Sequence, residues 1–155
     1  MLVDFEILPA ESRIWVYASI QKLGTGEEEY ILNYISNHLN GWVAHGAPLR
    51  SSVKILDHYF IVVALDEAFN EASGCSIDSL QNNIKEIEQE LAISLMNRLN
   101  IYCIIKDVIT CVPIGDLGDA IDQETLFYDL TIKSKAELSS WLKPIKEGWC
   151  NTLLG

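Results

Sequence analysis

A chain of 155 residues, of which 49% are hydrophobic, can bury a core without disulfides or metal ions and is too apolar to be disordered. Its 11 Lys and Arg residues are outnumbered by 22 Asp and Glu residues, and the net charge of −11 repels phosphate backbones and anionic lipid headgroups. We therefore expect neither a nucleic acid nor a membrane among its partners.

The amino-terminal segment contains Asp4, Glu6 and Glu11 but no basic cluster, so it does not have the composition of a secretion signal. The longest apolar run, Tyr59 to Leu65, is far shorter than the roughly 20 residues of a membrane-spanning helix. None of the cysteines forms a Cys-x-x-Cys pair, which argues against a zinc knuckle or a thioredoxin-type motif. We expect a cytoplasmic protein with free thiols.

The first half of the chain predicts a strand, a helix and a hairpin. Arg13 to Ala18 is β-branched and aromatic, which is typical of a strand. After Gly24 to Gly26, three glutamates and apolar residues at helical spacing predict a helix that ends near Trp42. Ser52 to Leu56 and Tyr59 to Leu65 predict a hairpin. The second of these strands is apolar throughout, so it should be central and covered on both faces.

The strongest helical pattern begins at Ile77 and extends to about Leu99, with one apolar and one polar face. Ser76 is its expected N-cap, and Asp78 is expected in its first turn, where the helix dipole favours a negative charge. Asn100 is the expected stop.

Ile101 to Ile105 and Val108 to Val112 predict a second hairpin. A two-residue turn would pair Ile105 with Val108 and Cys103 with Thr110. Cys111 would then point to the opposite face of the sheet from Cys103, because side chains alternate along a strand, so a disulfide between the two cysteines is disfavoured. A three-residue turn would reverse this consequence for the cysteines.

The rest of the chain carries weaker signals. Thr125 to Tyr128 indicates a short strand. Ser134 is a candidate helix N-cap with a glutamate at the capping-box position, and Pro144 limits that helix to about two turns. We expect Trp141 and Trp149 to pack this tail onto the main domain.

The order of predicted elements is β-α-β-β-α-β with one further strand. This is the order of the ferredoxin-like α+β plait, an antiparallel sheet with two main helices on one face, here with an extra hairpin strand and a C-terminal extension. We therefore expect a single domain over 1–155, in which 1–112 form the α/β core and 113–155 pack on it.

In this plait the loop after the first helix and the loop before the second helix lie at the same end of the sheet. The first loop is Trp42 to Pro48 and the second is Asp66 to Ser76, and the Lys106-Asp107 turn belongs to the same end. The residues expected to share one cleft there are His45, Asp66, Cys75, Ser76 and Asp78.

Small and hydroxyl residues crowd the start of the second predicted helix, at Ser73 to Ser76. Backbone N–H groups at a helix start have no intrahelical partner, so they can hold an anion or lower the pKa of a thiol. One hypothesis makes Cys75 a nucleophile and His45 its general base. The alternative packs Cys75 on Leu80 as a hydrophobic staple, while His45 holds its own loop.

Other residues around this helix start are candidate contacts for a ligand. Arg50 follows the His45 loop and could pair with an anion, whereas Ser76 and Asp78 have the alternative role of helix caps. A metal site of His45, Cys75 and Asp66 would lack any ligand-spacing signature, and we expect neither a metal nor a cofactor. The candidate ligand-binding residues are Arg50, Ser73, Gly74, Ser76, Asp78 and Asp66.

Two strings in the chain are fairly specific: Trp42-x-Ala44-His45-Gly46-x-x-Leu49 and Ser73-Gly74-Cys75-Ser76-Ile77-Asp78-Ser79. Together they resemble an uncharacterised family of small proteins from Bacteroidetes-type bacteria. Leu8-Pro9 and Ser12 to Tyr17 fit the same family, so the resemblance covers most of the chain. The tail residues that also fit are Thr125, Lys133, Glu137, Trp141, Pro144 and Trp149.

Members of that family often carry the label ABC transporter ATPase. A phosphate-binding P-loop requires Gly-x-x-x-x-Gly-Lys-Ser/Thr, and this string does not occur in the chain. Gly24 and Gly26 are followed by three glutamates, whose charge would repel phosphate. We therefore expect no P-loop ATPase, and the resemblance implies a family without a mechanism.

Three hypotheses about function follow from the residues. The first is a small domain that binds a small ligand or a protein partner at the loop end carrying His45 and Cys75. The second is a thiol-dependent enzyme that uses the same two residues. The third is a purely structural or interaction protein, in which the aromatic tail forms a homodimer contact. A pocket beside Cys75 would favour the first two, and a flat apolar patch near Trp141 and Trp149 would favour the third.

Overall fold

The computed structural model describes residues 1–118 and 120–154, and the chain divides into two compact units. Unit 1 comprises Met1–Met96 and Lys133–Ala136, and unit 2 comprises Asn97–Ile132 and Glu137–Gly155. This division differs from the expected one at residue 112, because the second hairpin belongs to unit 2. That all 155 residues form one domain stays a prediction.

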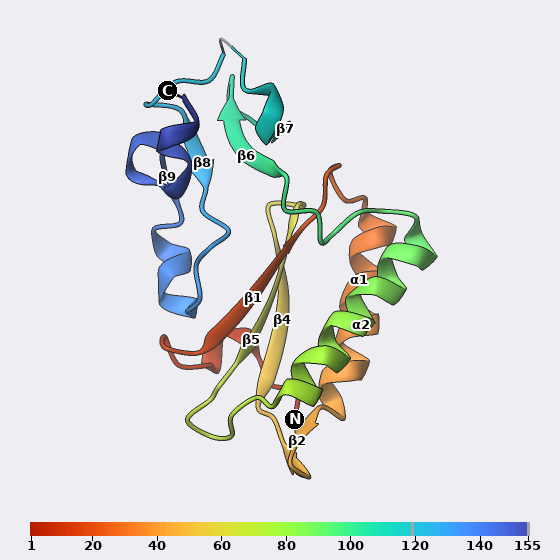
Figure 1. Ribbon diagram of the computed structural model, residues 1–155. Helices are drawn as coiled ribbons and strands as arrows, with labels where there is room; N and C mark the ends of the chain where they lie inside the picture. Colours follow the sequence, from red (N-terminus) through yellow and green to blue (C-terminus); the bar gives the residue numbers. More distant parts are fainter. Residues whose placement is uncertain (119, 155) are drawn as a thin grey trace. The chain divides into compact units, whose positions relative to one another are not determined.

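Unit 1 is a three-stranded antiparallel sheet with two helices on one face (Figure 1). The strands lie in the order β1-β5-β4, and β5 is central and buried along its whole length, as predicted. A short strand pair, β2 with β3, and a 3-10 helix, η1, complete the unit. The bounds are η1 Phe5–Ile7, β1 Arg13–Ala18, α1 Thr25–Asn40, β2 Val43–Ala44, β3 Ala47–Pro48, β4 Ser51–Leu56, β5 Phe60–Leu65 and α2 Gly74–Leu91.

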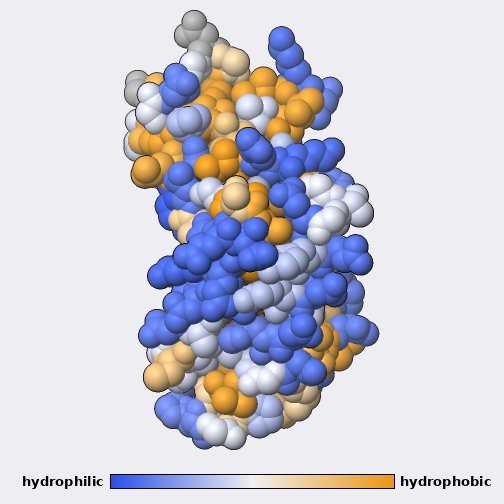
Figure 2. All heavy atoms as spheres, turned by 90° about the vertical axis from the view of Figure 1, so that its right-hand side faces the viewer, coloured by the Kyte–Doolittle hydropathy of each residue, from blue (hydrophilic) through white to orange (hydrophobic). Residues whose placement is uncertain are grey.

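The core of unit 1 forms between the helices and one face of the sheet. Alternate residues of β1 and β5 point to this face, because side chains alternate along a strand. Residues three or four apart on α1 and α2 meet them, and burial of each large apolar side chain stabilises the fold by roughly 1.5–3 kcal/mol. This core contains Tyr17, Ile61, Val63 and Leu65 from the sheet and Ile31, Ile35, Leu39, Leu80, Ile84 and Ile87 from the helices. The outer side of both helices is mostly hydrophilic (Figure 2).

Helix α2 ends at Leu91, about two turns before the predicted end. Ala92 takes a left-handed conformation with φ of 52° and caps the helix. The Glu88 carboxylate then accepts the backbone N–H groups of Leu95 and Met96 at 2.7 and 3.1 Å. The predicted end was wrong because the apolar spacing continues to Leu95, which packs in the core from beyond the helix.

Unit 2 is built on a four-stranded antiparallel sheet in the order β7-β6-β8-β9. The β6–β7 hairpin has the predicted register, with Ile105 opposite Val108 and Cys103 opposite Thr110. The strand predicted near Phe127 forms β8, while the expected helix after Ser134 is a short 3-10 helix. The bounds are β6 Asn100–Ile105, β7 Val108–Pro113, η2 Ile114–Asp116, β8 Leu126–Tyr128, η3 Lys135–Ser139, β9 Leu142–Pro144, η4 Ile145–Glu147 and η5 Trp149–Leu154.

The fold is thus mixed α+β with antiparallel sheets, but the four-stranded plait is not confirmed. The three strands of unit 1 have the order and direction that the plait requires. The expected fourth strand, Ile101–Ile105, lies in the sheet of unit 2 instead. The free edge of β1 has other neighbours: Ala18 donates its N–H to the Leu95 carbonyl at 3.2 Å, and Ile14 donates to the Lys133 carbonyl at 3.0 Å.

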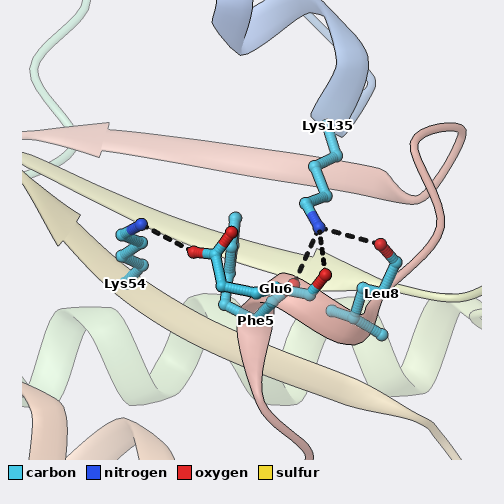
Figure 3. A network of polar contacts seen from close by, with 5 residues as sticks. All are labelled: Phe5, Glu6, Leu8, Lys54 and Lys135. Atoms are coloured by element: carbon cyan, nitrogen blue, oxygen red, sulfur yellow. Dashed lines mark hydrogen bonds and ion pairs between the residues drawn. The ribbon is translucent and has the colours of Figure 1, made fainter.

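Lys135 fixes the returning segment 133–136 in unit 1 (Figure 3). Its Nζ donates to the backbone carbonyl oxygens of Phe5 and Leu8 at 2.9 and 2.8 Å and lies 3.3 Å from that of Glu6. These carbonyls belong to η1 and to Leu8, its C-cap residue, and an ammonium group stabilises carbonyl oxygens as a charged donor. Lys54 and Lys135 both lie over the Phe5 ring, at 5.6 and 5.2 Å from its centroid.

Candidate functional site

The two loops expected at one end of unit 1 contact each other. The indole Nε1 of Trp42 donates to the backbone carbonyl of Ser76 at 2.8 Å. The side-chain amide of Asn70 donates to the carbonyl oxygens of Ala47 and Pro48 at 3.2 and 3.3 Å. The α1–β4 connection and the β5–α2 connection therefore meet, as the order of elements predicts. The Lys106-Asp107 turn, which was expected beside them, belongs to unit 2.

Two serines close the start of α2 in a reciprocal capping box. The Ser73 side chain accepts the backbone N–H of Ser76 at 3.1 Å, and the Ser76 side chain accepts the N–H of Ser73 at 2.8 Å. The predicted N-cap at Ser76 was wrong by three residues, because either serine of such a box can be taken for the cap from sequence. Asp78 is consequently beyond the first turn and exposed. Both serines serve the helix start.

Cys75 is the second residue of α2, and its side chain is exposed. Gly74, the first residue, is exposed as well. The interpretation of Cys75 as a buried staple against Leu80 was therefore wrong, since the earlier helix start turns the thiol outward. The thiol is therefore accessible to reagents at the start of the helix.

His45 occupies the tip of the two-residue turn between β2 and β3. Its φ is 53° and that of Gly46 is 77°, so both residues adopt the left-handed backbone of a type I′ hairpin. The imidazole is exposed. The turn explains the His-Gly sequence structurally, because glycine adopts this conformation without steric cost.

Asp66 and Arg50 lie side by side where β5 ends and β4 begins. The Asp66 N–H donates to the Arg50 carbonyl at 2.9 Å, and an Asp66 carboxylate oxygen accepts the N–H of Ala68 at 3.1 Å. Asp66 is buried at 7% exposure, so it shapes the turn that follows β5. The structure does not gather His45, Cys75 and Asp66 as metal ligands; no three His, Cys, Asp or Glu side chains are so placed among the described residues.

A cavity of about 250 Å³ lies within unit 2, and none of the predicted site residues lines it. Its walls combine four aromatic residues with aliphatic and polar ones. They come from β6, β8, the segments beside these strands, and the first residue of η5. The lining residues are Asn97, Arg98, Asn100, Ile101, Tyr102, Phe127, Tyr128, Leu130, Thr131 and Trp149.

The cavity has a buried aromatic wall and an exposed rim. Phe127 and Tyr102 are 0% and 1% exposed, whereas Trp149 is 47% exposed. Tyr128 is supported by Trp141, whose ring lies edge-on at 4.9 Å between centroids. Trp141 thus packs inside unit 2, and Trp149 borders the cavity. The sequence predicted both tryptophans as packing residues of the tail or as a homodimer contact and did not predict the cavity, because its other aromatic residues lie on the separate strands β6 and β8.

The remaining thiols of the chain are poorly placed for chemistry. Cys103 and Cys150 are buried in the core of unit 2. Burial raises the pKa of Cys103 to about 11 and also raises the pKa values of Cys111 and Cys150. A thiol reacts as its thiolate, so these three are expected to be inert near neutral pH.

No protein-family model, curated protein or solved structure matches the chain. Membership of the Bacteroidetes-type family therefore stays a prediction. Within the described part of the chain, none of the helices has both the length and the apolar character needed to cross a bilayer.

Proposed function

We propose that the protein binds a small molecule and that the cavity of unit 2 is its binding site. The observation that carries this proposal is the cavity itself, whose wall is aromatic and whose rim is polar. Ligand sites are typically concave and mainly apolar, with a few polar groups that fix the orientation of the ligand. This proposal keeps the predicted class of function, a binding domain, but moves the site from unit 1 to unit 2.

The size of the cavity limits what it can hold. Pockets for drug-sized ligands measure about 300–1,000 Å³, and this one measures about 250 Å³. A compound of one or two rings would fill it. Tyr102, Tyr128 and Trp149 would supply flat apolar surface at little loss of side-chain entropy, since aromatic side chains have only two rotatable bonds.

A fragment screen by NMR on the full chain tests the proposal. Ring-containing fragments should shift the indole N–H signal of Trp149 and the amide signals of β6 and β8. The variant Leu130→Trp fills the cavity from a half-buried lining residue and should abolish these shifts. Leu142→Trp is the matched control, because Leu142 is an exposed residue of unit 2 outside the cavity. Absence of fragment-induced shifts, or shifts that persist in Leu130→Trp, would contradict the proposal.

The exposed thiol of Cys75 supports a second candidate function, a thiol-dependent activity at the loop end of unit 1 with His45 as general base. Both side chains are accessible, and the loops that carry them are in contact through Trp42 and Asn70. Loss of an enzymatic activity in Cys75→Ser, together with a reduction of the same activity in His45→Asn, would identify it. Alkylation of the native thiols as a function of pH is the first measurement.

The third hypothesis, a homodimer formed through the aromatic tail, now depends on Trp149, because Trp141 is buried within unit 2. A sedimentation experiment on wild type and Trp149→Ser tests it: a dimer that this substitution dissociates would favour an interaction protein.

We also propose that unit 1 is a ferredoxin-like plait whose fourth strand is interrupted. The sheet order and the antiparallel pairing support this, and so do the two separate neighbours of the β1 edge, Leu95 and the Lys133-Ser134 segment. A solution structure in which the β1 edge has a different neighbour would contradict it.

A further inference from the structure

We infer that the ligand of the unit 2 cavity is a planar, largely apolar molecule with one anionic group, of which an aromatic carboxylate is the simplest example. This inference rests on the proposed function and adds to it the chemical class of the ligand. It is carried by the charge of the lining residues, by the exposure of the rim, and by the size of the cavity.

The charge is the first observation. Among the ten residues that line the cavity, Arg98 is the only charged one. The chain as a whole has twice as many acidic as basic residues, 22 against 11. The lining of the cavity has the opposite balance, because it contains a cation and no carboxylate. An apolar site that contains a single positive charge favours an anion over a neutral or cationic ligand.

The second observation is that Arg98 is available. Two other cations of unit 2 already have carboxylate partners: Lys143 lies 3.2 Å from Asp129, and Lys146 lies 2.8 Å from Glu124. For Arg98 the described residues provide no ion pair of this kind. Its guanidinium offers a planar fork of donors that matches the two oxygens of a carboxylate.

The third observation concerns where the charge and the apolar surface lie. Arg98 and Trp149 are exposed, while Tyr102 and Phe127 are buried. A ligand can therefore place its ring against the aromatic wall and keep its anionic group at the rim. The arrangement avoids full desolvation of the anion, which would be costly in an apolar interior. A volume of about 250 Å³ admits a fused two-ring acid and excludes larger amphiphiles from complete burial.

Calorimetric titration with a matched pair of probes, 2-naphthoate and its neutral amide 2-naphthamide, tests the inference on the full chain. The two compounds have nearly the same shape and differ in charge. We expect naphthoate to bind the wild type at least tenfold more tightly than naphthamide. Arg98→Gln should weaken naphthoate to about the level of the amide and should weaken naphthamide by a much smaller factor. Lys106→Gln is the matched control, because Lys106 is an exposed cation of the same unit that does not line the cavity.

The outcomes separate this inference from the proposed function. Equal affinities for the acid and the amide would show that the cavity does not distinguish charge, which overturns the inference and leaves the binding function standing. The same conclusion holds if Lys106→Gln weakens naphthoate as much as Arg98→Gln does. If neither probe binds while other fragments occupy the cavity, the proposed ligand class is wrong. If the fragment screen also finds no occupant, the proposed function fails with it.

Discussion

Gly148 lies so close to the ring of Phe127 that a Cβ atom at position 148 would be 2.1 Å from Phe127 Cζ. Phe127 is fully buried in the core of unit 2 and lines its cavity. The backbone at Gly148, with φ of −110° and ψ of 174°, is open to any residue, so glycine is needed here for space. The chain between η4 and η5 thereby holds the aromatic wall of the cavity in place.

Gly148→Ala is expected to destabilise unit 2 by about 1–3 kcal/mol, the usual range for an overpacked core. The clash with the Phe127 ring can be relieved only if the ring or the backbone moves. Hydrogen exchange should show faster exchange at the β6 and β8 amides, with little change in α1 and α2. Gly115→Ala, at a position with no atom within 4 Å of the added Cβ, is the control. Equal effects of the two substitutions would contradict the account of Gly148.

Lys135→Met is expected to destabilise unit 1 by about 1–2 kcal/mol, because the η1 carbonyls lose a charged donor and the Phe5 ring loses one of its two cations. Urea denaturation monitored through unit 1 amides is the measurement. Lys54→Met is the comparison, since it removes the exposed ion pair with Glu6 and the other ammonium over the Phe5 ring, whereas the carbonyl contacts belong to Lys135 (Figure 3). A loss for Lys54→Met as large as that for Lys135→Met would show that the carbonyl contacts contribute little.

Ala92→Gly is expected to stabilise α2 by up to about 1 kcal/mol. A left-handed backbone is costly for alanine and not for glycine, and this gain exceeds the added entropy of the unfolded chain. The thermal midpoint should rise. Ala68→Gly, in an exposed loop at a position without positive φ, carries only the entropic penalty and should lower the midpoint slightly. A lower midpoint for Ala92→Gly would contradict the left-handed cap.

Native alkylation should label Cys75 first. Cys75 is exposed, whereas burial raises the pKa of Cys103 to about 11 and also raises the pKa values of Cys111 and Cys150. A raised pKa leaves less thiolate at a given pH, so the labelling of these three should increase only at high pH or after unfolding. Mass spectrometry of peptides after iodoacetamide treatment between pH 6 and about 9 resolves the four sites.

The pH dependence at Cys75 then decides between two roles for this residue. Half-maximal labelling well below pH ~8.5 would indicate an activated thiol and favour the enzyme hypothesis. Labelling that follows an ordinary thiol titration would leave Cys75 as an accessible surface residue. Slower labelling of Cys75 than of Cys103 would contradict the structure of the α2 start.

Local signals in the sequence predicted the parts of the fold that local physics decides. The β6–β7 register follows from a two-residue turn and the alternation of strand side chains, and the buried β5 follows from its uninterrupted apolar run. The contact between the loops of Trp42 and Ser76 follows from the order of elements. In the first two cases neighbouring residues carry the information, and in the third the order of helices and strands along the chain carries it.

The pairing of strands that are far apart in the chain could not be predicted from the sequence. Ile101–Ile105 has the composition of a strand in either sheet, and only its pairing with Phe127 and the β7 residues places it in unit 2. The cavity was not predicted for the same reason. Its lining comes from segments that are far apart in the chain and that the folding of unit 2 brings together, among them Arg98, Tyr102, Phe127 and Trp149. At the start of α2 the error was local: a serine at both ends of the capping box made two helix starts equally plausible.

The return of 133–136 to unit 1 has a consequence for biosynthesis. The β1 edge and the carbonyls of η1 obtain their Lys133 and Lys135 contacts only after the ribosome has added more than thirty-five residues beyond Met96. Until then the nascent unit 1 exposes the edge of an apolar strand, the kind of surface that pairs with other chains. Completion of the first unit therefore comes late in its own synthesis, although its two helices and all three strands of its sheet precede Asn97 in the chain.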